Sequence, residues 1–159
     1  MKKSVHSITK ISMIACFILF FFTVGFYQLA GNKAPSTVEE NKVLLKRLVE
    51  EAYNQRTLGV LDEIMAPDYV MHTNGITYEN VGPEGVKINI TENLQLYPDF
   101  KVTIEDMFGE GDRVALRWIF QGTHTQFGKQ VTLAGIYICR FAEGKIAEGW
   151  QIYDNLGSS

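Results

Sequence analysis

The chain has 159 residues, of which 46% are hydrophobic and 21% charged, and its formal net charge at pH 7 is −3. All charged residues before Pro35 are lysines, and the remainder carries 11 basic and 18 acidic residues, an excess of negative charge that argues against nucleic acid as a partner. Only Cys16 and Cys139 could form a disulfide, and they lie in an apolar leader and on the apolar face of a strand, so we expect no disulfide framework.

The N-terminal segment is basic over residues 1–10 and then uncharged over residues 11–30. Twenty apolar residues can cross a bilayer, so we predict a signal or anchor segment at 1–31 with a transmembrane helix at about 11–30. The preceding lysines favour a cytoplasmic N-terminus and a domain on the extracytoplasmic side. Small residues at Leu29-Ala30-Gly31 leave cleavage open, so the protein is expected to be membrane-anchored or secreted. Residues 32–37 form a linker to a domain at 38–157.

Three helices are predicted in the first half of this domain. Ser36 with Glu39, or Thr37 with Glu40, can form a capping box, and apolar residues then recur at helical spacing over residues 38–55. A short helix follows at 58–65 and ends before Pro67, since proline disfavours helical geometry in the preceding residue. After a brief strand at 68–73 and a turn at 74–75, a third helix begins at 82–85 and ends before Pro98.

The second half alternates apolar and polar residues, which is the period of a strand with one buried face. The predicted strands cover residues 100–104, 114–124, 131–141 and 146–153, joined by tight glycine-containing turns. Helices that precede a meander favour an α+β fold with the helices packed on one face of a curved antiparallel sheet. Three helices cannot cover such a sheet completely, so we expect a cone with an opening, in which a small ligand would bind.

Several segments carry a family likeness when taken in order: NKVLLKRLVEEAYNQRTLGVLDEIMAPDYVMHT, GPEG, YPDFKVTIEDMFGEGDRVALRW, GTHT and GKIAEGWQIYD. Together they span residues 41–154 and resemble the SnoaL-like polyketide cyclase (ester cyclase) family of the nuclear transport factor 2-like superfamily. The resemblance implies the cone fold of that superfamily, with about three N-terminal helices on a curved sheet. This fold hosts cyclases, isomerases, dehydratases and proteins without chemistry, so it does not by itself establish an activity.

For an activity, the resemblance implies an intramolecular aldol condensation without metal or other cofactor, in which an aspartate on the last strand acts as acid and base. A carboxylate in an apolar cone has a raised pKa and can move a proton next to a carbonyl. The family pattern His-Trp-Asp reads Gly149-Trp150-Gln151 here. An amide cannot accept a proton at neutral pH, so this mechanism does not transfer intact. The turn at 126–129 is also shorter than in many family members, which predicts a different cover over the mouth of the cone.

The candidate catalytic residues are His72, Tyr137 and Gln151, with Asp154 as an alternative acid/base. His72 matches the family's DYVxH element and is expected near the pocket, where it could polarise a carbonyl, or it could be a structural histidine. Tyr137 and Gln151 are expected to share the inner face across the hairpin at 142–145, with the tyrosine hydroxyl bound to a carbonyl oxygen. By strict alternation Asp154 points to the opposite side of the sheet from Gln151, so a bulge would be needed to turn it inward.

The candidate substrate-binding residues are Trp118, His124, Met71 and Leu133. Trp118 is interpreted as a residue that lines the pocket rather than one that takes part in catalysis. His124 could either contact ligand or stabilise the strand end. Trp150 is expected on the outer face, where superfamily members often form homodimers. No histidine, cysteine and carboxylate cluster has metal-ligand spacing, so no metal site is predicted.

Two functions stay open at this point. The first is a cofactor-independent cyclase or isomerase that acts by proton transfer on a small, mostly apolar carbonyl compound. The second is a non-catalytic extracytoplasmic module that binds a hydrophobic ligand or another protein. Replacement of the acid/base by Gln151 favours the second, and the polar residues expected on an otherwise apolar face favour the first.

Overall fold

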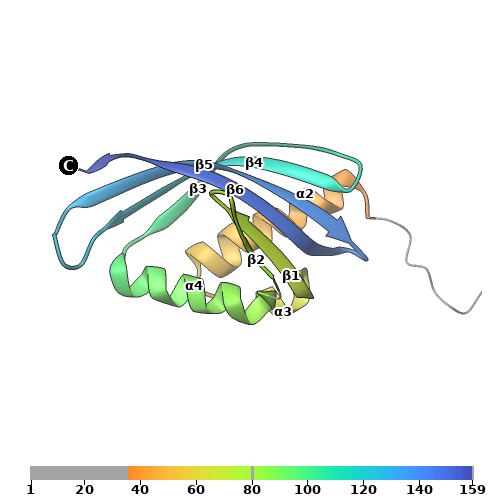
Figure 1. Cartoon of the computed structure of the whole chain (residues 1–159), viewed down its shortest axis with the longest axis horizontal. Helices are drawn as coiled ribbons and strands as arrows, with labels where there is room; N and C mark the ends of the chain where they lie inside the picture. The colour runs from red at the N-terminus through yellow and green to blue at the C-terminus, as the bar shows by residue number, and fades with distance from the viewer. Residues whose placement is uncertain (1–35, 80, 159) are drawn as a thin grey trace, which may run out of the picture. The chain divides into compact units, whose positions relative to one another are not determined.

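The computed structural model describes residues 36–79 and 81–158 (Figure 1). The helices are α2 (Val38–Arg47), the π-helix η1 (Leu48–Asn54), α3 (Val60–Ile64) and α4 (Gly82–Leu96). The strands are β1 (Met65–Thr73), β2 (Ile76–Tyr78), β3 (Lys101–Glu110), β4 (Arg113–Thr123), β5 (Gln130–Ala142) and β6 (Lys145–Ser158). Within these ranges, no helix combines the length and the hydropathy that a membrane crossing requires. The predicted transmembrane helix at 11–30 lies outside the described residues.

All six strands form one sheet in the order β2-β1-β6-β5-β4-β3. The meander from β3 to β6 is antiparallel, as predicted, but β1 pairs with β6 in parallel. A parallel pair needs a long connection, and here α4 and the three strands of the meander supply it. The β2 strand was not predicted, because three residues are too short to show a period.

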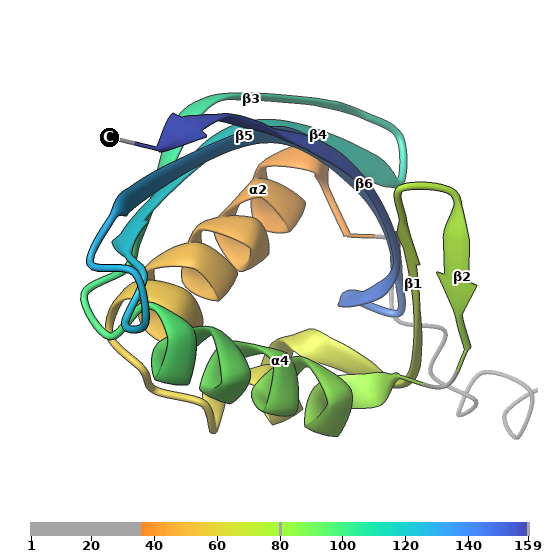
Figure 2. The ribbon, with the colours of Figure 1, turned by 60° about the vertical axis from the view of Figure 1, so that its left-hand side comes forward.

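Figure 2 shows the sheet arching over α2 and α4, which lie on its concave side. The strand pairing shifts register at three places in the meander, between Ile104 and Asp106, Thr132 and Leu133, and Arg140 and Phe141. Such bulges bend and twist a strand, which contributes to the arch. The predicted α+β cone with helices on one face of a curved sheet is therefore confirmed.

The helices begin and end at slightly different residues than predicted, because local hydrogen bonds and proline set their ends. Thr37 is the N-cap of α2: its hydroxyl accepts from the Glu40 N–H while the Glu40 carboxylate accepts from the Thr37 N–H, the second of the two predicted capping boxes. The helix then widens into η1 rather than continuing as an α-helix to Gln55. α3 ends at Ile64, and Pro67 lies inside β1, where the pairing with β6 is interrupted between Met65 and Val70.

The core lies between the helices and the concave face of the sheet. Its buried side chains come from every helix and from the inward positions of the long strands; the largest fully buried ones include Leu45, Leu61, Ile64, Met65, Tyr69, Ile90, Leu116 and Ile146. Cys139 is also fully buried and free, as a small apolar core residue would be.

Candidate functional site

Three rows of register-paired residues cross the concave face of the sheet near its middle. The first is Val114, Cys139, Gly149 and Met71; the second is Leu116, Tyr137, Gln151 and Thr73; the third is Trp118, Gly135 and Tyr153. Paired residues of neighbouring strands point to the same face, so each row forms a line of adjacent side chains. None of these positions holds a carboxylate or an imidazole.

The second row contains the polar centre of this face. Gln151 on β6 lies between Tyr137 on β5 and Thr73 on β1, and its amide Nε2 donates to Thr73 Oγ1 over 3.4 Å. The register places Tyr137 and Gln151 side by side, as the hairpin pattern predicts. Gln151 and Thr73 are both partly exposed, so an amide and a hydroxyl are available for a ligand at neutral pH without any ionised group.

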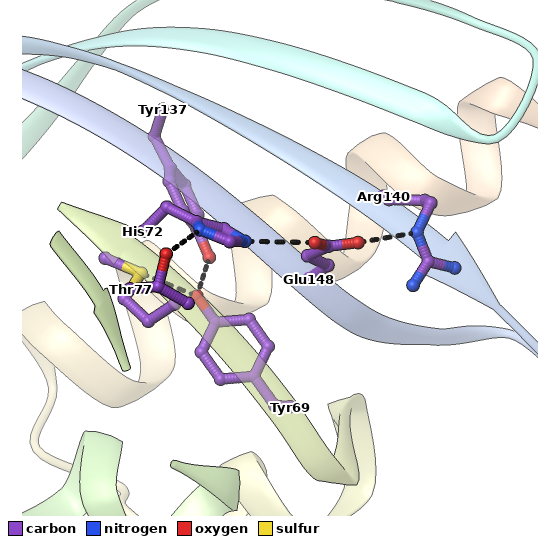
Figure 3. Close-up of polar contacts among 7 residues, drawn as sticks. Tyr69, His72, Thr77, Tyr137, Arg140 and Glu148 are labelled. Carbon is purple, nitrogen blue, oxygen red and sulfur yellow. Dashed lines mark hydrogen bonds and ion pairs between the residues drawn. The ribbon is translucent and has the colours of Figure 1, made fainter. Parts of the chain in front are cut away.

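Beside this row, two tyrosines meet in the interior (Figure 3). The hydroxyls of Tyr69 on β1 and Tyr137 on β5 lie 2.7 Å apart, and Tyr69 also donates to Met71 Sδ over 2.9 Å. Tyr69 is 1% exposed and Tyr137 8%. Burial raises the pKa of both tyrosines well above the usual value, so both hydroxyls stay protonated and can act as donors.

A glycine makes room for this tyrosine pair. A side chain at Gly149 would collide with Tyr137 and with the Tyr69 hydroxyl. The two phenols therefore lie directly against the β6 backbone. Sequence reasoning singled out Tyr137 but missed Tyr69 and Thr73. The alternation within residues 68–73 could have found both, because Tyr69, Met71 and Thr73 occupy every second position.

Trp118 forms the wall of the third row. A Cβ at Gly135 would lie 2.6 Å from Trp118 Cζ2, so the indole ring packs directly against this glycine. Its ring also lies 6.0 Å from that of Tyr153 between centroids. Leu133 and Met71 are partly buried and pack against the core from the same face. The inner face thus combines an aromatic wall with the polar row of Gln151.

His124 lies at the end of the cone, in the turn after β4. Its ring contacts Tyr97 edge-on at 5.2 Å and Phe127 at 4.7 Å, and its Nδ1 accepts from the Gln126 N–H. The same turn is bound to the end of α4, where the Thr125 N–H donates to the Leu96 carbonyl. The short turn at 126–129 is therefore held against α4 at this end of the cone, and His124 stabilises the turn, one of the two roles expected for it.

His72 does not join this face, and the expectation that it lies near the pocket is wrong. It pairs with Trp150, whose ring stacks on the imidazole with the ring centroids 5.1 Å apart and an angle of 3° between the ring planes. The imidazole Nε2 lies 3.0 Å from Glu148 Oε1. The reason is strand alternation: His72 stands between Met71 and Thr73, which point inward. Hydrogen bonds from His72 and Arg140 hold the pKa of Glu148 below its ordinary value, so this outer-face carboxylate is anionic at neutral pH.

Asp154 also lies on the outer face and is exposed. It pairs with Ala134, and its carboxylate accepts from the Asn155 N–H. The bulge in this part of β6 comes after Asp154, between the pairs formed by Thr132 and Leu133, so it does not turn the aspartate inward. Asp154 therefore does not replace the missing acid/base, and this alternative is wrong on geometry.

The surface of the described domain has depressions away from the polar row. One, of about 420 Å³, is lined by residues of the α2 N-terminus and the nearby β3–β4 and β5–β6 turns, including Val38, Asp112 and Phe141. Another, of about 400 Å³, lies along β1 and the β5–β6 hairpin and is lined by residues that include Val70, Arg140 and Glu148. Neither is lined by Tyr137 or Gln151. Metal-ligand clusters of three or more side chains do not occur within 36–79 and 81–158.

A sequence model of the family described as SnoaL-like polyketide cyclase matches residues 43–159. Among solved structures, AclR of Streptomyces galilaeus, a candidate hydroxylase, is 26% identical with a TM-score of 0.65, over 74% of this chain and 91% of that chain. IdmH of Streptomyces antibioticus, a candidate polyketide cyclase, is 27% identical with a TM-score of 0.63, over 71% and 91%. A candidate polyketide cyclase of Acidithiobacillus ferrooxidans is 25% identical with a TM-score of 0.65, over 72% and 88%. Comparison with curated proteins gives no significant match.

Proposed function

Because the chain belongs to the SnoaL-like polyketide cyclase family, we propose that it binds a small, mostly apolar carbonyl compound against the concave face of its sheet. The observation that supports this most is the uncharged polar row of Tyr137, Gln151 and Thr73 in an otherwise apolar surface. A carbonyl oxygen that accepts from the Gln151 amide would gain a hydrogen bond in a low-dielectric setting. The flat ring of Trp118 would cover the apolar part of the compound.

The site favours binding over proton transfer. The family resemblance implies an aspartate that acts as acid and base at the position of Gln151, and Gln151 cannot accept a proton at neutral pH. The three inner rows offer no other carboxylate or imidazole. A second candidate function, enolate chemistry, is favoured by one observation: the protonated hydroxyl pair of Tyr69 and Tyr137 could stabilise an oxyanion.

Binding is tested with prodan, a neutral naphthyl ketone whose fluorescence moves to the blue in apolar surroundings. The wild-type protein should bind prodan saturably. Gln151→Leu, which removes the amide at similar volume, should weaken binding about tenfold, the effect of losing one hydrogen bond. Gln121→Leu is the matched control, because Gln121 is exposed on the outer face. Absence of saturable binding, or equal loss in both variants, would contradict the proposal.

Catalysis is tested by deuterium exchange at the α-carbon of 2-tetralone, followed by NMR. Wild-type exchange no faster than buffer supports a binding protein. Gln151→Asp would place a carboxylate beside Tyr137 and should create exchange activity. Exchange by the wild type that is lost in Tyr137→Phe would instead establish the catalytic alternative.

For partners, we propose a homodimer through the outer face of the sheet. Trp150 lies there beside three isoleucines, of which Ile136 is 53% exposed and Ile152 73%. An exposed apolar strip of this kind marks interaction surfaces. Sedimentation equilibrium should give a dimer for the wild type and a monomer for Ile136→Lys, whereas a monomeric wild type would refute this assembly.

Outside the described residues, the apolar segment at 11–30 supports a membrane-anchored or secreted domain on the extracytoplasmic side, which protease protection of intact cells would test.

A further inference from the structure

A chain of polar contacts crosses four strands on the outer face (Figure 3). Thr77 Oγ1 on β2 lies 2.9 Å from His72 Nδ1 on β1. His72 Nε2 lies 3.0 Å from Glu148 Oε1 on β6, and Arg140 Nε on β5 donates to Glu148 Oε2 over 3.0 Å. This array, Thr77-His72-Glu148-Arg140, ties the β1–β2 hairpin to the main sheet through side chains.

The imidazole at the centre of the array is held from a third direction. The Trp150 ring stacks parallel on it, and the Arg113 guanidinium lies 5.2 Å from the Trp150 ring. The charged groups that face this region are therefore Glu148, Arg140 and Arg113. Both His72 and Glu148 keep only 24% of their side-chain surface exposed, so their hydrogen bonds are partly shielded from water and stronger than those of a free surface pair.

The array adds a side-chain tie between β1 and β6 on the outer face of the sheet. After Met65 the pairing is interrupted; it resumes for the four residues from Val70 to Thr73 and is followed by a hydrogen bond from the Asn74 N–H to the Gln151 carbonyl. A slip of this short segment by one residue would turn its side chains to the opposite face of the sheet. Within those four residues, His72 is the member whose side chain bonds directly to β6 on the outer face.

Register at this point decides the geometry of the inner face. His72 is flanked by Met71 and Thr73, which point to the opposite side. Thr73 is bonded to Gln151, and Met71 to Tyr69. A shift or loosening of β1 at His72 would therefore move one wall of the polar row, although His72 itself touches nothing on that row.

We propose that His72 is a positioning residue for the concave site, and that the Thr77-His72-Glu148-Arg140 array is a latch that holds β1 in the register required for ligand binding. This inference rests on the proposed function for its ligand. It gives a role to a histidine that lies on the wrong side of the sheet for direct contact. Ligand affinity is thereby sensitive to changes on the outer face of the sheet, away from the proposed binding site.

The test compares three variants of the full chain. His72→Leu removes both hydrogen bonds, and His72→Gln retains a donor that can reach Glu148. Arg117→Gln is the control, because it breaks an outer-face ion pair with Asp106 that does not involve β1. The measurements are the prodan dissociation constant, the emission maximum of bound prodan at saturation, and hydrogen exchange of the β1 amides.

We expect His72→Leu to weaken prodan binding about tenfold, within the range by which residues without ligand contact change the coupling to a site, and to move the emission of bound prodan to the red as water reaches the loosened wall. His72→Gln should restore much of the prodan affinity and of the emission maximum, and Arg117→Gln should change neither quantity. Emission at saturation reports the bound site itself, so simple loss of folded protein would leave it unchanged. Wild-type affinity and emission in His72→Leu would overturn the latch.

The two proposals fail separately. If the wild type binds prodan but His72→Leu behaves like it, only the latch is refuted. If the wild type does not bind prodan, the proposed function fails, and hydrogen exchange alone decides the latch. In that case the amides of residues 70–73 should exchange faster in His72→Leu than in Arg117→Gln, and equal rates would refute it.

Discussion

Replacement of Gly149 by alanine tests whether the tyrosine pair is packed against the β6 backbone. The added Cβ would lie 2.5 Å from Tyr69 Oη and from Tyr137 Cε2, and closer still to Tyr137 Oη. Real Cβ atoms do not approach so closely, so one or both rings must move. Both are core residues, and Tyr69 is almost completely buried, so neither ring can swing into solvent.

The expected cost has two parts. Overpacking of a well-packed core typically costs about 1–3 kcal/mol. Separation of the two hydroxyls would add about 1 kcal/mol for the lost hydrogen bond. We therefore expect Gly149→Ala to lower the free energy of unfolding by about 2–4 kcal/mol, measured by urea denaturation with an unchanged m-value.

The chain offers a matched control at Gly59. It has ordinary helical backbone angles, and an added Cβ would meet nothing within 4 Å. Gly59→Ala should therefore leave stability unchanged or raise it by up to about 1 kcal/mol, through the unfolded state. A loss below about 0.5 kcal/mol in Gly149→Ala, or an equal loss in both variants, would show that the tyrosines are not held as the structure places them.

Three further outcomes are expected. The pKa of Glu148 is lower in the folded than in the unfolded state. Its bonds to His72 and Arg140 therefore stabilise the fold above the ordinary glutamate pKa, and this stability is lost as the pH falls through the lowered pKa. Urea denaturation from neutral to acidic pH should show this loss of stability in the wild type and a smaller loss in Glu148→Gln. Burial raises the pKa of the Cys139 thiol, so iodoacetamide should label it only after unfolding, and rapid labelling of the native protein would contradict its placement. Thr37→Ala should cost about 1 kcal/mol of stability by removing the cap of α2, and no change in the urea midpoint would show that the capping box is not formed.

The inner face of the meander could be predicted from the sequence because its signal is local. Period-two alternation assigns Leu133, Tyr137 and Cys139 to one face. The hairpin alone does not place Gln151 beside them: unbroken pairing from Ala142 and Lys145 would set Tyr137 opposite Trp150. The bulge between Arg140 and Phe141 shifts the register so that Tyr137 lies opposite Gln151.

The placement of β1 could not be predicted in the same way. Its partner β6 lies more than seventy residues further along the chain, and no local pattern specifies which strand a short segment joins or in which direction. The match to a family element predicts His72 near the pocket, but a match of residue type does not show to which side of the sheet the side chain points. The alternation of Tyr69, Met71 and Thr73 was visible and would have placed His72 correctly.

The two faces of the sheet differ in how they combine hydrogen bonding and charge. On the inner face, Tyr69 and Tyr137 are kept protonated by burial, and Gln151 has no charge to lose. Such a surface can hold a carbonyl oxygen over a wide pH range without pairing a buried ion, which is costly in a core. The ionised groups, Glu148 and Arg140, lie on the outer face, where water shares their solvation. The arrangement is stable because it separates hydrogen bonding from charge, and the same separation removes the base that proton transfer would need.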